Sequence, residues 1–232
     1  MDASAVTQAV GGALPAALGI ALSPIPIIGV ILILGTSRAR SGGPAFAFGW
    51  VFGLAVVGGL VLVVTGWSGE ASTAGSSTAD SINWMKVGLG VVLLVLARKQ
   101  WRRRPEPGTT PELPAWMAKI DEMAPARALG VGVLLSGVNP KNLILTLAAA
   151  ASIAQVPDIT TGEEVAALAL FVAIASVTVI GAVVAYLVGG DRATAFLAGV
   201  REYMTAHNSV IMMVILLLIG AKLIGDGTGA LS

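Results

Sequence analysis

Long apolar runs separated by short polar segments dominate the chain. A bilayer-spanning helix needs about 20 apolar residues, and six runs reach or approach that length. They are Val10–Leu34, Pro44–Gly66, Ile82–Ala97, Ala128–Ala154, Val165–Gly189 and Ser209–Ile224. Lipid accepts only helices or closed barrels, and these runs lack the alternation of barrel strands. The pattern therefore predicts an all-α polytopic membrane protein with six transmembrane helices.

The composition supports this prediction. Of the 232 residues, 56% are hydrophobic and only 12% are charged. Soluble domains carry about 25% charged residues, so roughly half of the usual solvating charge is missing. A soluble single-domain enzyme is excluded, and little of the chain remains for parts outside the membrane.

Basic residues gather in the segments that follow the first, third and fifth runs, whereas every charged residue in the segments after the second and fourth runs is acidic. The basic set is Arg38, Arg40, Arg98, Lys99, Arg102, Arg103, Arg104, Lys119, Arg127, Arg192 and Arg201, and the acidic set is Glu70, Asp80, Asp158, Glu163 and Glu164. By the positive-inside rule, the basic segments face the cytoplasm and both termini lie outside.

Residues 101–126 form a basic, proline-rich linker on the predicted cytoplasmic side. The linker separates a first unit, residues 1–100, from a second unit, residues 127–232. Each unit holds three runs, and an odd number makes the two units enter the membrane in opposite directions. This is the topology of inverted-repeat transporters. The basic residues of 98–127 are interpreted as an orientation signal, with binding of anionic lipid headgroups as an alternative.

Proline interrupts the first and the fourth run at corresponding places. The two motifs are Ser23-Pro24-Ile25-Pro26 and Asn139-Pro140-Lys141-Asn142. Because proline has no N–H and clashes with the preceding turn, each motif breaks its helix and leaves backbone groups without helical partners. The two half-helices that follow would point their positive ends at the membrane centre and frame a central pocket. Kinks that serve only packing are the alternative.

Lys141 is the only charged residue near the centre of any run. Placing a lysine there costs about 2.5–3.5 kcal/mol, which polar neighbours would offset in part. Two interpretations remain: Lys141 binds substrate, or it is a structural peg that bonds carbonyls freed by the breaks. The candidate substrate-binding residues are Ser23, Pro24, Pro26, Ser136, Asn139, Pro140, Lys141, Asn142 and Thr146.

The missing residue types narrow the chemistry. No Asp or Glu lies inside any run, so the pocket should favour an anionic or polyhydroxyl group over a cation. We expect no catalytic residues, metal site, cofactor or nucleic-acid partner. Gly49-x-x-x-Gly53 in the second run predicts close helix packing within the bundle, and a homodimer formed through such a face remains open.

The two motifs carry a resemblance to a known family. Ala-Leu-Ser-Pro-Ile-Pro at 21–26 and Gly-Val-Asn-Pro-Lys-Asn at 137–142 resemble the GAP family. These are actinobacterial glycolipid- or sulfolipid-addressing (Sap-like) proteins placed in the lysine-exporter (LysE) superfamily. The resemblance also covers the length, the six runs and the basic linker. It implies a multi-pass protein of the bacterial plasma membrane that helps to move cell-envelope lipids or glycolipids beside lipid-synthesis machinery.

Three functions therefore stand as hypotheses. The first is export or translocation of an anionic or glycosylated cell-envelope lipid, with Lys141 at the headgroup. The second is export of amino acids or other small solutes, as elsewhere in the superfamily. The third is a non-transporting scaffold that docks lipid-synthesis enzymes through residues 98–127.

Overall fold

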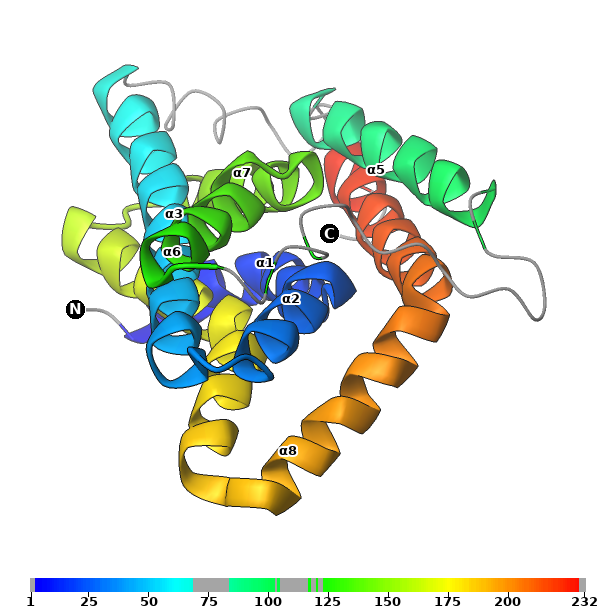
Figure 1. Ribbon diagram of the computed structural model, residues 1–232. Helices are drawn as coiled ribbons and strands as arrows, with labels where there is room; N and C mark the ends of the chain where they lie inside the picture. Colours follow the sequence, from blue (N-terminus) through cyan, green and yellow to red (C-terminus); the bar gives the residue numbers. More distant parts are fainter. Residues whose placement is uncertain are drawn as a thin grey trace.

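The computed structural model describes residues 3–68, 84–102, 104, 117, 120 and 123–229 (Figure 1). No strand occurs in these ranges, and the prediction of an all-α protein is confirmed. Two of the predicted outward-facing acids, Glu70 and Asp80, and most of the predicted linker 101–126 lie outside the described residues.

Each predicted run contains a helix, although the boundaries differ. The helices are α1 (Ala3–Ala21), α2 (Pro24–Leu34), α3 (Ala39–Ser68), α5 (Trp84–Arg102), α6 (Pro125–Val133), the π-helical turn η2 (Leu134–Val138), α7 (Pro140–Ala154) and α8 (Thr161–Thr228). The first run starts earlier than predicted, at Ala3 rather than Val10. The third continues through the basic residues as far as Arg102.

Both predicted breaks are present. The first run is divided into α1 and α2 by Leu22 and Ser23. The fourth is divided at Asn139, where the segment Pro125–Val138 and α7 meet at an angle of 60°. In each case the second helix begins at the proline, because a proline in the first helical position loses no hydrogen bond.

Helix α8 is kinked and forms two arms. Its 68 residues would extend about 100 Å if straight, whereas the hydrocarbon core of a bilayer is about 30 Å thick. At Gly190 the backbone leaves the helical region, with φ 56° and ψ −143°, a conformation that is essentially restricted to glycine. Figure 1 shows the chain turning there, so that residues 161–189 (the first arm) and 191–228 (the second arm) diverge as a V.

The remaining helices lie between and beside the two arms. Helices α1 and α2 lie between them, α3 lies beside the first arm with α6 packed against it, and α5 runs along the second (Figure 1). Leu168 of the first arm packs against Gly58 of α3. Gly220 of the second arm faces Gly90 of α5, backbone against backbone. The first arm therefore packs against α3, and the second arm packs against α5.

Glycines let α3 and α6 approach closely. A Cβ atom added to Gly49 would overlap the carbonyl oxygen of Leu129, and one added to Gly132 would overlap the carbonyl oxygen of Phe46. At Gly53 the obstacle would be the hydroxyl of Ser136. The predicted role of Gly49-x-x-x-Gly53 in packing within the bundle is confirmed, because these glycines are needed where one helix backbone touches the next.

Three described helices are long and apolar enough to cross a membrane, and a fourth span results if the bent pair counts as one. They are α1, residues Ala39–Thr65 of α3, α8, and the pair Pro125–Val138 with Pro140–Ala154. Helix α5 is not among them, since Lys99 and Arg102 extend it into the basic segment. Helix α8 counts once although it holds two predicted runs. A protein with several apolar helices of membrane-spanning length is thus established, whereas six spans in two inverted repeats remain a prediction.

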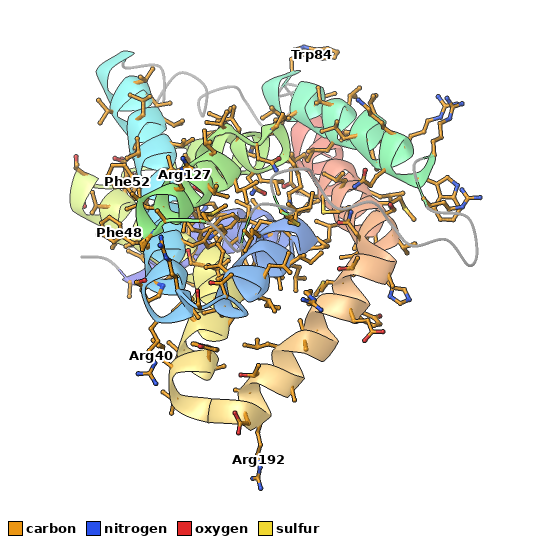
Figure 2. All side chains as sticks on the ribbon, viewed as in Figure 1. Arg40, Phe48, Phe52, Trp84, Arg127 and Arg192 are labelled. Atoms are coloured by element: carbon orange, nitrogen blue, oxygen red, sulfur yellow. The ribbon has the colours of Figure 1, made fainter. Side chains whose placement is uncertain are left out.

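The outer surface of the bundle is apolar. On α3, large hydrophobic side chains at a spacing of four residues are exposed, among them Phe48 (64%) and Phe52 (51%), which point away from the bundle in Figure 2. Arg40 and Arg192 extend outward at the end where α8 is kinked, and Trp84 lies at the opposite end (Figure 2). An apolar band of this kind is suited to contact with lipid.

Candidate functional site

The first break leaves carbonyl groups of α1 without helical donors. Pro24 has no N–H for the carbonyl of Ile20, which instead accepts from the backbone N–H of Ser23 at 3.0 Å. In a continuous helix the N–H of Ser23 would instead donate to the carbonyl of Gly19, so this carbonyl has no backbone donor. Side chains replace the missing donors: the Nζ of Lys141 donates to Gly19 at 2.9 Å, and the Oγ1 of Thr178 donates to Ala21 at 2.5 Å.

The second break follows the same logic with different partners. Asn139 donates its backbone N–H five residues back, to the carbonyl of Leu134 at 3.0 Å, which forms the π-helical turn. The next donor in that pattern would be Pro140, which has none, so the carbonyl of Leu135 is left free. The Nδ2 of Asn142 donates to it at 2.8 Å. Lys141 and Asn142, adjacent in the chain, thus each serve a carbonyl that proline has freed.

The two residues that precede the breaking prolines have nearly the same backbone conformation. Ser23 has φ −68° and ψ 116°, and Asn139 has φ −59° and ψ 120°. Steric contact with the following proline ring disfavours helical angles and favours this extended region. They differ as caps, because the Oδ1 of Asn139 accepts from the backbone N–H of Lys141 at 3.1 Å whereas Ser23 makes no side-chain capping bond. The pairing of the two motifs in the sequence is therefore matched by equal local geometry.

The ammonium group of Lys141 is buried, and few hydrogen bonds offset the cost of removing it from water. The residue is 6% exposed, and Gly19 supplies its one hydrogen-bond acceptor among the described residues. An ammonium group has three N–H donors, so two remain unused there. Among the described residues, no carboxylate forms an ion pair with Lys141. Asp226 pairs with Lys222 of the same helix instead. A buried positive charge without a counter-charge is costly and suited to an anionic ligand.

Other buried polar atoms in the bundle have no partner in the described part of the chain. They are Asn142 Oδ1 and Thr146 Oγ1, one turn apart on α7, together with Ser176 Oγ and Asn208 Oδ1 of α8 and Trp50 Nε1 of α3. An unsatisfied buried polar group costs about 1–3 kcal/mol, so native proteins retain few of them without a functional reason or a bound water. The two on α7 lie one and five residues after Lys141 in the chain.

The structure separates the predicted site residues by environment. Lys141, Asn142 and Thr146 are all buried in the first two turns of α7, and Ser23, Pro24 and Pro26 are buried at the start of α2. Ser136 is buried against Gly53 and donates to the carbonyl of Val133 at 3.2 Å, which is a packing contact. Asn139 is partly buried, and Pro140 is exposed.

Three contributors were not among the predicted site residues. Thr178 closes the end of α1 through its bond to Ala21, and Ser176 and Trp50 add unpartnered polar atoms. The available signal was the presence of two polar residues, Ser176 and Thr178, inside an otherwise apolar run. Polar groups are costly in a membrane helix unless they find a partner. The backbone carbonyl of Gly19 carried no sequence signal.

The fold and the two breaks define an α-helical membrane protein in which a lysine joins two interrupted helices. Comparison with protein families gives a narrower identification. The family model SfLAP, described as "Sap, sulfolipid-1-addressing protein", matches residues 13–229, and the chain belongs to this family. The resemblance to sulfolipid-addressing proteins is thereby confirmed. No curated protein and no solved structure matched the chain.

Proposed function

We propose that this protein moves an anionic or glycosylated cell-envelope lipid across or out of the plasma membrane. Its site would be the junction of the two proline-broken helices. The family description names a sulfolipid, and the acidic sulfur group of such a lipid carries a negative charge. The apolar outer surface and the several membrane-length helices support a function inside the bilayer.

The observation that carries the proposal is the state of Lys141. Its buried ammonium has one described acceptor, the Gly19 carbonyl, and no described counter-charge. A sulfate or phosphate oxygen would use the two remaining donors and neutralise the charge. The unpartnered amide oxygen of Asn142 and hydroxyl of Thr146 would then meet sugar hydroxyl groups. The peg contact to Gly19 and the binding of an anion are compatible, because they use different N–H groups.

Helices α1 and α7 and the second arm of α8 meet along a seam beside this junction. Near Gly19 the seam is closed by Ile219 and Leu145. Further along, a crevice of about 10 Å³, room for roughly one water, is lined in part by Ser152, Lys222 and Asp226. Polar groups therefore continue beyond the buried lysine.

The finer architecture belongs to the same proposal. We propose placement in the LysE superfamily, with six spans as two inverted repeats and with both termini outside. Equal backbone angles at Ser23 and Asn139 favour the repeat, and outward-pointing Arg40 and Arg192 at one end favour that end as the cytoplasmic one (Figure 2). Alternating access would rock one repeat against the other, without enzymatic chemistry.

Transport in proteoliposomes tests the proposal. The probe is a sulfated glycolipid with a fluorescent label on its acyl tail. The comparison probe is the same labelled glycolipid without the sulfate. A membrane-impermeant quencher reports which leaflet holds the label, with and without an imposed proton gradient. We expect wild-type protein to move the sulfated probe faster than protein-free liposomes do. Lys141→Gln should lose most of this activity, and Lys86→Gln, which removes a lysine of α5 outside both broken helices, should keep it.

Three results would overturn the proposal. Equal movement of the sulfated probe by wild type and Lys141→Gln would remove the proposed role of the lysine. Efflux of a loaded radiolabelled amino acid without lipid movement would favour a small-solute exporter. If neither probe moves, and cellular function depends on residues 98–127 but not on the two motifs, the scaffold hypothesis would replace transport.

A further inference from the structure

A second feature lies away from the broken helices, between α5 and the second arm of α8. It is a groove of about 430 Å³, within the range of small-molecule sites, that is open along one side. Its walls are almost wholly apolar. They are formed by Leu94, Ala97, Met213 and Leu217. We call it the α5–α8 groove.

One end of the α5–α8 groove is basic and aromatic. Arg98 and Trp101, from the last turns of α5, complete its lining. The guanidinium of Arg104 lies 4.1 Å from the centre of the Trp101 ring and donates to the Trp101 carbonyl at 3.3 Å. The groove therefore has apolar walls along its length and two guanidinium groups with an indole at its end.

This arrangement has the polarity of a lipid molecule. An open apolar groove on a membrane helix pair is filled by acyl chain, because nothing in the hydrocarbon core satisfies a polar occupant. Tryptophan prefers the headgroup level of the bilayer. The planar fork of arginine matches the oxygens of a phosphate, and Arg98 is exposed and able to reach one.

We propose that the α5–α8 groove binds an anionic phospholipid of the leaflet that faces the basic segments. One acyl chain lies along Leu94 and Leu217, and the phosphate lies on Arg98. Arg104 holds the Trp101 ring in place as the wall between chain and headgroup. The bound lipid is a resident of the bilayer and not the transported substrate, so this inference does not depend on the proposed function.

Quenching of Trp101 fluorescence by brominated acyl chains tests the inference in the full-length protein in nanodiscs. Brominated phosphatidylglycerol is compared with brominated phosphatidylcholine of the same chains, titrated into unbrominated phosphatidylcholine. The difference between wild type and Trp101→Phe isolates the signal of Trp101. The variants are Arg98→Gln and, as a matched control, Lys99→Gln, which removes an exposed cation of the same turn that does not line the groove.

The expected result is half-maximal quenching of Trp101 at about fivefold less phosphatidylglycerol than phosphatidylcholine, from one basic contact at the membrane surface. Arg98→Gln should remove most of this preference, and Lys99→Gln should retain it. Equal quenching by the two lipids in wild type would overturn the inference. So would an unchanged preference in Arg98→Gln, or a Trp101 signal that neither lipid quenches.

Discussion

The ammonium of Lys141 donates a 2.9 Å hydrogen bond to the carbonyl of Gly19, a residue 122 positions earlier in the chain. This bond joins the two broken helices, and both of its ends exist because of proline. Pro24 frees the carbonyl, and Pro140 starts the helix that carries the lysine. The two motifs are therefore one structural unit.

The unpartnered hydroxyl of Thr146 gives a test that separates stability from function. Thr146→Val keeps the shape of the side chain and removes a buried group that has no described partner. We expect the free energy of unfolding to rise by about 1 kcal/mol, because an unsatisfied group is lost. If the hydroxyl serves a sugar headgroup, transport of the sulfated glycolipid should fall several-fold. Thermal unfolding in detergent and the liposome assay measure the two effects, and loss of stability would contradict the account.

Restoring the missing N–H at the first break should disable the junction. In Pro24→Ala, residue 24 has an N–H that donates to the carbonyl of Ile20. The N–H of Ser23 can then donate to the carbonyl of Gly19, so Lys141 loses its acceptor. We expect transport to fall at least tenfold while the protein stays folded. Pro44→Ala, which removes a proline from inside α3, should retain transport. Equal effects of the two substitutions would show that the break itself has no role.

The contact between α3 and α6 should be sensitive to a single methyl group. Gly49→Ala would place that methyl against the backbone carbonyl of Leu129, which cannot rotate away. We expect a loss of about 1–3 kcal/mol in the free energy of unfolding. Gly59 of the same helix has open space where its Cβ would be, so Gly59→Ala should be neutral or stabilising. Thermal unfolding in detergent compares the pair, and similar melting temperatures would contradict the close contact.

The kink of α8 should depend on the one residue that permits it. Gly190 has φ 56° and ψ −143°, where a Cβ atom is strongly disfavoured. Gly190→Ala should destabilise the protein by about 1–3 kcal/mol or change the angle between the arms. Gly181→Ala, in the regular part of the first arm, should be neutral or stabilising. Thermal unfolding, with spin-label distances between the arms, checks both effects, and an unchanged distance and stability in Gly190→Ala would be inconsistent with the kink.

The breaks were predictable from sequence because their cause is local. Proline lacks a donor wherever it stands, so Ser23–Pro26 and Asn139–Asn142 indicate interruptions without knowledge of the fold. Lys141 was identifiable because a charge inside an apolar run is costly. Its partner was not, since Gly19 contributes only a backbone carbonyl, and nothing local relates α1 to α7.

The extent of the helices was less predictable. An apolar run ends at the first charges, but a helix does not, because the long side chains of Arg98 and Lys99 are compatible with helical turns. Helix α5 therefore continues to Arg102. Likewise, the fifth apolar run ends at Gly189, whereas the helix resumes at once beyond Gly190, a single non-helical residue.

The location of the headgroup is the central claim, and photo-crosslinking measures it most directly. The probe is a sulfated glycolipid with a photoreactive group on its sugar, bound to the wild-type protein in nanodiscs and mapped by peptide mass spectrometry. The account predicts labelling within residues 141–146 of α7, suppressed by excess unlabelled sulfated lipid but not by its uncharged counterpart, and reduced in Lys141→Gln. Labelling confined to the outer face of α3 or to the α5–α8 groove would contradict it.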